Sequence, residues 1–134
     1  MTPDIKAVFE SYQRGDVGPL AAALAPDVAW VVPGKSGLAG RYEGLDGILG
    51  LFDLAQTVSG GTYQQSLVDV LTGVSHAAVL YRATGRNATA SLDIDMVLLC
   101  RLDGHQVTHI TALPCDPGAF EAFWGLTDRL DDGT

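Results

Sequence analysis

Residues 90–114 read ASLDIDMVLLCRLDGHQVTHITALP and carry a strand pattern on both sides of Asp103-Gly104. An Asp-Gly pair between two such runs is typical of a tight turn joining antiparallel strands. The stretch therefore predicts a long β-hairpin. The same pattern extends back to residue 62, and the strands that it predicts are 62–72, 76–84, 90–102 and 106–114.

Helical spacing of apolar residues comes before these strands. Thr2 and Pro3 suit the start of a first helix, which Gly15 ends. The remaining predicted elements are a short helix over 17–24, a strand over 28–32, a helix over 45–57 and a last helix over 117–126. Helices followed by an antiparallel meander indicate an α+β fold in one domain, 1–127, with an acidic tail at 128–134.

Composition narrows the range of partners. The 134 residues include 16 acidic and 8 basic side chains, which gives a net charge of −8. No basic patch for nucleic acid or for anionic lipid is expected, and the apolar runs are too short to span a bilayer. Met1-Thr2-Pro3-Asp4 lacks the basic residues of a signal peptide, so we expect a cytoplasmic protein.

The two cysteines are expected to be free thiols. A turn centred on Asp103-Gly104 places Cys100 opposite Val107 or Thr108, and Cys115 near Asp93. At about 3.3 Å per residue the thiols then lie roughly 23 Å apart along the strands, too far for a disulfide. The histidines are well separated and no Cys-x-x-Cys spacing occurs, so neither a metal nor another cofactor is expected.

Several short motifs resemble the SnoaL-like group of the nuclear transport factor 2-like superfamily, which includes polyketide cyclases and relatives of ketosteroid isomerase. The motifs are Phe9-x-x-Tyr12-x-x-Gly15-Asp16, Leu24-x-Pro26-Asp27-Val28, Pro33-Gly34 with Leu38-Ala39-Gly40-x-Tyr42-x-Gly44, Arg101-Leu102-Asp103-Gly104-x-x-Val107, and Asp116 with Phe123-Trp124. The resemblance implies a cystatin-like cone, in which a curved, mostly antiparallel sheet wraps the helices around an apolar pocket. Many members of this superfamily are dimers.

Two activities of that superfamily are not expected. The resemblance puts the base and the oxyanion-hole acid of ketosteroid isomerases at Val32 and Leu98, and their tyrosine near Val8. It puts one acid of limonene-type epoxide hydrolases at Leu113. Apolar side chains cannot transfer a proton, so the acids of both enzymes are absent.

Asp116 and His109 are the candidate catalytic residues. Asp116 matches the general acid/base of SnoaL-type cyclases and shares strand parity with Ile110 and Ala112, which would surround it with apolar side chains and raise its pKa. The alternative is that Asp116 caps the last helix, with Pro117 at its first position. His109 is either a functional group or a residue on the sheet surface or in a dimer contact.

Trp30 and Tyr81 are the strongest candidates for a ligand-binding wall, because each offers a large apolar area and one polar group. Ordinary core packing is the alternative for both. The complete predicted pocket consists of Trp30, Val32, Tyr81, Met96, Leu98, Ile110 and Ala112. Strand 90–102 is apolar on both faces, and a second copy of the chain is the simplest cover for the outer face, so a homodimer is expected.

Three functional hypotheses follow. The first is a cyclase or isomerase that acts on an apolar, polyketide-like carbonyl compound, with Asp116 as the general acid/base. The second is a protein that binds a small apolar ligand without catalysis, which the apolar residues Val32 and Leu98 favour. The third is a dimeric interaction module without a ligand. The sequence leaves open whether the chain is an enzyme.

Overall fold

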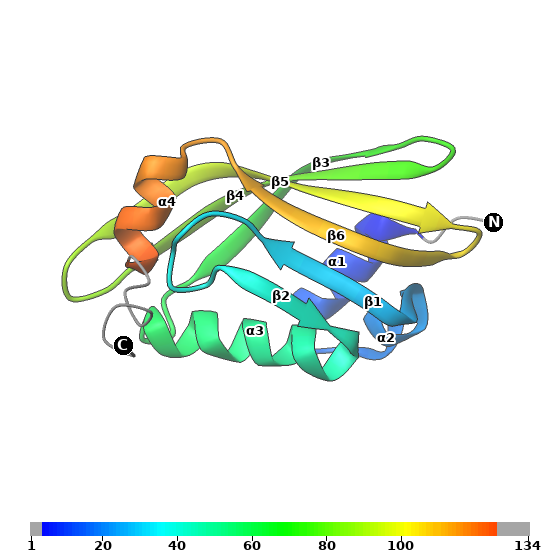
Figure 1. Ribbon diagram of the computed structural model, residues 1–134, viewed down its shortest axis with the longest axis horizontal. Coiled ribbons are helices and arrows are strands. Elements are labelled where there is room, and N and C mark those ends of the chain that lie inside the picture. The colour runs from blue at the N-terminus through cyan, green and yellow to red at the C-terminus, as the bar shows by residue number, and fades with distance from the viewer. Residues whose placement is uncertain (1–3, 126–134) are drawn as a thin grey trace.

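The computed structural model describes residues 4–125, which form four helices and one six-stranded sheet (Figure 1). The elements are α1 (Ile5–Gln13), α2 (Gly18–Ala23), β1 (Leu24–Val32), β2 (Gly40–Glu43), α3 (Gly44–Val58), β3 (Gln64–Thr72), β4 (His76–Arg86), β5 (Ser91–Asp103), β6 (Gln106–Pro114) and α4 (Pro117–Trp124). The predicted α+β class is confirmed, and the four strands of the meander lie close to their predicted ranges.

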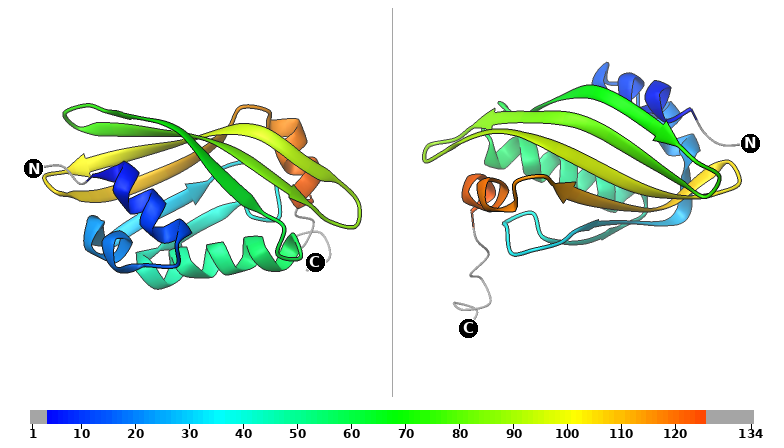
Figure 2. Two further views of the ribbon diagram at one scale, coloured as in Figure 1. Left: turned by 180° about the vertical axis from the view of Figure 1, so that it is seen from behind. Right: turned by 90° about the horizontal axis from the view of Figure 1, so that it is seen from above.

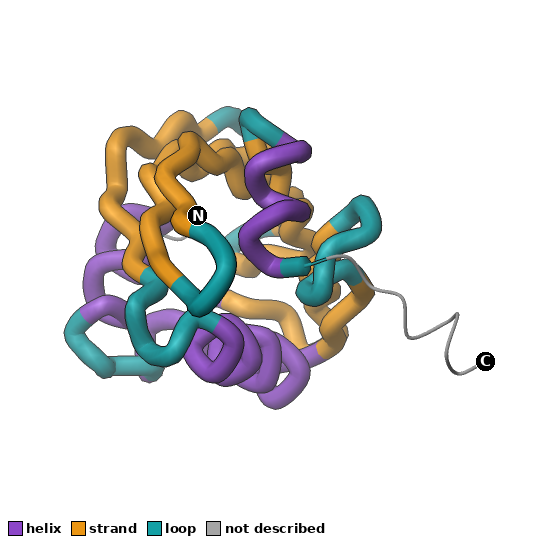
Figure 3. The backbone as a smooth tube through the Cα atoms, turned by 90° about the vertical axis from the view of Figure 1, so that its left-hand side faces the viewer, coloured by secondary structure: helices purple, strands orange, loops and turns teal. Residues whose placement is uncertain are grey.

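The sheet runs in the order β2-β1-β6-β5-β4-β3. Every neighbouring pair is antiparallel except β1 and β6, which are parallel. The strands curl over one side of the molecule and α3 closes the opposite side (Figure 3). This is the curved, mostly antiparallel arrangement that the sequence predicted.

The core lies on the concave face of the sheet. Along β5, residues alternate between buried and exposed, because successive side chains of a strand point to opposite faces. The inward set is Leu92, Ile94, Met96, Leu98, Cys100 and Leu102. Helices α1 and α3 cover this face, and α4 lies across the end of the sheet near the C-terminus (Figure 2).

Asp4 caps the start of helix α1, because its carboxylate accepts a hydrogen bond of 3.1 Å from the backbone N–H of Ala7. The predicted start at Thr2 and Pro3 lies outside the described residues, as does the predicted tail 128–134. Among the helices within residues 4–125, none combines the length and apolar character needed to cross a bilayer.

The predicted register of the β5–β6 hairpin was wrong. Asp103 pairs with Gln106, so the two turn residues are Gly104 and His105 rather than Asp103 and Gly104. Gly104 has φ 64°, and a glycine at the first central position is typical of a type II′ turn. A further shift between Arg101 and Leu102 then brings Cys100 opposite Ile110.

Two other boundaries differ from the prediction. Strand β1 begins at Leu24, earlier than expected, and residues 40–43, which belong to none of the predicted elements, form the edge strand β2. The cysteines are both free, with Cys100 buried and Cys115 exposed.

Candidate functional site

Two cavities with mainly apolar walls border the concave face of the sheet among the described residues, and the larger of this pair, of about 70 Å³, lies between that face and the N-terminal helices. Alternating inward residues of the strands supply one wall, because the sheet curves around them. That wall includes Val79, Leu98, Cys100, Val107 and Ile110. The opposite wall includes Ile5, Val8, Phe9, Tyr12, Leu20 and Phe52.

A smaller cavity of about 40 Å³ continues toward α4. Its walls include Val32, Leu38, Tyr63, Tyr81, Met96 and Phe120. Trp30, Phe52 and Gln65 line both cavities. The two cavities therefore adjoin, with these three side chains as the partition between them.

Aromatic contacts build the partition. The rings of Trp30 and Phe52 meet edge to face with centroids 5.3 Å apart, and the Phe52 ring lies 4.8 Å from that of Tyr12. Phe52 comes from α3, Trp30 from β1 and Tyr12 from α1. Three elements thus hold the partition in place from different sides.

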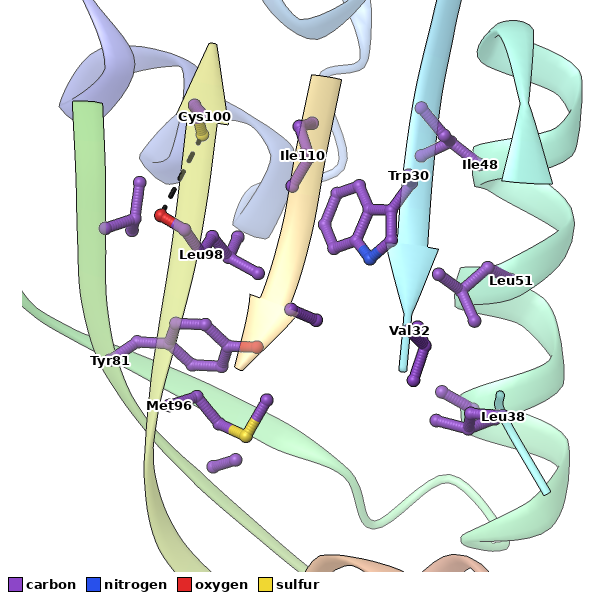
Figure 4. Close-up of a cluster of buried hydrophobic side chains, with 14 of the residues drawn as sticks. Trp30, Val32, Leu38, Ile48, Leu51, Tyr81, Met96, Leu98, Cys100 and Ile110 are labelled. Atoms are coloured by element: carbon purple, nitrogen blue, oxygen red, sulfur yellow. Dashed lines mark hydrogen bonds between the residues drawn. The ribbon is translucent and has the colours of Figure 1, made fainter. Parts of the chain in front are cut away.

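Few polar groups lie in or beside the partition. Gln65 donates from Nε2 to the Tyr63 hydroxyl at 3.3 Å, and the Tyr63 and Tyr81 side chains are close enough to influence each other's pKa. The indole nitrogen of Trp30 is buried and has no hydrogen-bond partner. Figure 4 shows this nitrogen turned toward the space between Tyr81 and Val32.

Burial sets the ionisation of the titratable groups around the cavities. It raises the pKa of Tyr81 well above the usual value for a tyrosine, and it raises the pKa of Tyr63 as well. Burial also raises the pKa of the Cys100 thiol to about 12. These groups therefore keep their protons near neutral pH, where they can donate hydrogen bonds but cannot act as bases or thiolate nucleophiles.

The seven residues predicted to line a pocket all lie on the walls of the two cavities. Leu98 and Ile110 face the larger one, and Trp30 faces both. The others face the smaller one: Val32, Tyr81, Met96 and Ala112. Ligand binding by these residues stays a prediction.

The predicted surroundings of Asp116 were wrong. Strand β6 ends at Pro114, so the alternation of strand faces does not extend to Asp116. Its side chain is exposed and accepts a hydrogen bond of 3.1 Å from the backbone N–H of Ala119, which makes it the cap of α4. It lines neither cavity.

His109 also lies away from the cavities. It is exposed on the outer face of the sheet, opposite Arg101 of β5, and its Nδ1 lies 3.3 Å from the Thr108 hydroxyl. The structure therefore does not bring the two predicted catalytic residues, Asp116 and His109, together at either cavity. Within residues 4–125, no group of three histidine, cysteine or acidic side chains has the geometry to hold a metal ion.

Sequence reasoning missed Gln65, Tyr63 and Phe52. Gln65 had a detectable signal, because it lies at an inward position of a strand, two residues from Tyr63 and from Leu67, where an apolar residue is expected. Phe52 lies within the predicted helix 45–57, but its place between two cavities depends on how α3 packs across the sheet.

The sequence is similar to a known protein family. Residues 5–110, most of the chain, match the SnoaL-like domain. The chain belongs to the SnoaL-like family. An uncharacterized protein of Mycobacterium tuberculosis strain H37Rv is 31% identical to this SnoaL-like protein over 121 residues, which cover 90% of this chain and 92% of the relative.

Solved structures share the fold. A Xanthomonas campestris protein described as having a cystatin-like fold superposes with a TM-score of 0.81 at 23% identity, over 93% of this chain and 99% of that one. TerC, co-crystallized with polyporic acid, superposes with a TM-score of 0.74 at 23% identity, over 92% of this chain and 100% of that one. The SnoaL-like chain therefore has the cystatin-like cone that its motifs implied.

Proposed function

We propose that this SnoaL-like protein binds a small apolar molecule inside its cone and that no carboxylate of the pocket takes part in proton transfer. The observation that carries the proposal is the pair of adjoining cavities, whose described walls contain no aspartate, glutamate or histidine. Small-molecule sites are usually apolar and concave with a few polar groups, but they enclose about 300–1,000 Å³. The cavities here are smaller, at about 70 and 40 Å³, so the ligand we propose has to widen them. The co-crystal of TerC with polyporic acid supplies a precedent for a small molecule with this fold.

Cyclase or isomerase activity is the alternative that the family favours. Such a reaction needs a group that accepts or donates a proton near the substrate. The cavity walls offer Tyr63 and Tyr81, whose raised pKa values suit them to donating hydrogen bonds rather than to acting as bases. A reaction in this pocket would therefore rest on stabilising a developing negative charge on an oxygen.

Thermal unfolding with a panel of apolar aromatic compounds tests the binding proposal. Compounds that bind should raise the melting temperature and should be recovered chemically unchanged by mass spectrometry. Ala112→Met, which fills the smaller cavity, should reduce the shift in melting temperature. Leu113→Met on the outer face of the same strand is the matched control and should leave the shift unchanged.

Two results would contradict the proposal. One is a panel in which no compound raises the melting temperature of the unmodified protein. The other is an equal shift in Ala112→Met and Leu113→Met, because the ligand would then lie outside the cone. A product with altered bonds would instead support the cyclase or isomerase alternative.

A second copy of the chain is the proposed cover for the outer face of the sheet. Leu80, Val97 and Leu113 lie side by side across β4, β5 and β6, and Leu99 lies one row away from them. Leu99 is 42% exposed and Leu113 is 38% exposed. The right view of Figure 2 shows β3 to β5 passing in front of α3, with this face turned outward. Sedimentation should report a dimer that Leu99→Lys converts to a monomer; a monomeric unmodified protein would contradict it.

A further inference from the structure

The indole N–H of Trp30 is a hydrogen-bond donor with nothing to donate to. Trp30 is only 7% exposed, and its Nε1 is buried without a partner. Nearly all buried N–H groups in proteins are paired, so each exception calls for an explanation. The position of Trp30 on the partition between the two cavities provides one.

The Trp30 side chain borders both cavities, although its nitrogen itself has almost no accessible surface. Trp30 lines both cavities, and Figure 4 shows Nε1 turned toward the side of the smaller cavity that Tyr81 and Val32 form. Trp124 offers a comparison within the same chain. Its Nε1 is also buried and unpaired, but Trp124 lines neither cavity.

We infer that the ligand of this pocket carries a neutral hydrogen-bond-accepting oxygen of the carbonyl type, which Trp30 Nε1 binds, with an apolar group on each side of it. The inference rests on the proposed function and specifies its ligand. One apolar group occupies the larger cavity and the other the smaller, because the Trp30 side chain lines both.

The chemistry of the walls selects the kind of oxygen. An indole N–H only donates, so its partner must be an acceptor rather than a second donor. The described walls of both cavities contain no lysine, arginine or histidine. A carboxylate or phosphate would be buried there without a counter-charge, at a cost that a neutral ketone oxygen avoids.

Butyrophenone and butylbenzene are suitable probes, because they differ only by a carbonyl in place of a methylene next to the ring. The ring would enter the larger cavity and the propyl arm the smaller one, and both cavities, at about 70 and 40 Å³, would have to widen to admit them. Isothermal titration should show that the unmodified protein binds the ketone about tenfold more tightly, which corresponds to one good hydrogen bond. Trp30→Phe should abolish this preference, and Trp124→Phe, the matched control, should retain it.

Nuclear magnetic resonance provides a test that does not depend on the Trp30 variant being folded. The chain contains two tryptophans, so the ¹⁵N-labelled protein has two indole N–H signals, which Trp124→Phe assigns. Butyrophenone should move the Trp30 signal downfield, as a new hydrogen bond does. Butylbenzene should not move the Trp30 indole proton signal downfield. Neither probe should shift the Trp124 signal downfield.

The outcomes separate the two proposals. If neither probe binds, the proposed apolar site is wrong and this inference falls with it. If both probes bind equally well, or if Trp30→Phe keeps the preference for the ketone, the apolar site stands and the role of Trp30 is wrong. An unmoved Trp30 signal in the presence of bound butyrophenone would likewise overturn the inference.

Discussion

Replacing Phe52 by alanine should join the two cavities of the cone into one. The Phe52 ring lies between Trp30 and Tyr12 and lines both cavities. Its removal opens the partition without touching the indole donor on Trp30. The variant therefore separates the size of the cavity from its polar chemistry.

The cost in stability can be worked out from the surroundings of the ring. Truncating a fully buried phenylalanine to alanine costs about 3–5 kcal/mol, and an aromatic pair adds about 0.5–1.5 kcal/mol. Phe52 is half-buried but loses two aromatic partners, so we expect the free energy of unfolding to fall by about 3 kcal/mol. Leu54→Ala on the same helix is the control; Leu54 is 37% exposed, so it should cost less than about 1 kcal/mol.

Urea denaturation with and without butyrophenone measures both consequences. A ligand present at 100 times its dissociation constant stabilises the folded state by about 2.7 kcal/mol, so the ketone should restore most of the stability lost in Phe52→Ala. Its affinity for the variant should exceed that for the unmodified protein, because no ring has to move aside. A loss no larger than in Leu54→Ala, or a variant that the ketone fails to stabilise, would refute this account of the partition.

Two further predictions concern groups outside the partition. Asp116→Ala should lower the free energy of unfolding by about 1 kcal/mol and Asp116→Asn by much less, since asparagine also caps a helix; equal losses in urea denaturation would contradict the capping role. Burial raises the pKa of the Cys100 thiol to about 12, against about 8.5 in an unfolded chain. The part of the free energy of unfolding that depends on this thiol keeping its proton is therefore complete below about pH 8 and declines as the pH rises toward 12. In urea denaturation, Cys100→Ala should remove that part of the decline in stability at alkaline pH. At pH 8, iodoacetamide should label the exposed Cys115 but not Cys100 in the folded protein. An unchanged decline, or prompt labelling of Cys100, would contradict the effect of burial.

The strands were predictable because each alternates faces over many residues. The burial of β5 follows that alternation from Ser91 to Asp103, and the predicted pocket residues Met96 and Leu98 lie on its inward face. The turn at Gly104 was not predictable to the residue. Asp-Gly and Gly-His are both compatible with a two-residue loop, and the choice depends on which residue takes the positive φ angle.

The site was predictable only where it belongs to a single strand. Strand parity grouped Ile110 and Ala112, and both line the cavities, but the same rule failed at Asp116 because the strand ends at Pro114. Gln65 and Phe52 become neighbours of Trp30 only through the packing of three elements, β3, α3 and β1. A pattern within one segment of sequence cannot predict contacts between side chains of three different elements.

Val32 and Leu98 connect the family resemblance with the chemistry of this pocket. These are the positions at which the resemblance to ketosteroid isomerases would put the base and the oxyanion-hole acid, and both side chains line the cavities. A carboxyl group at either position would be surrounded by apolar side chains and would have a raised pKa, which is the condition for acid–base work near neutral pH. The described cavity walls of this chain thus carry apolar side chains at both positions, and their polar groups are uncharged hydroxyl, amide and indole groups. That combination favours holding a carbonyl compound over transforming it.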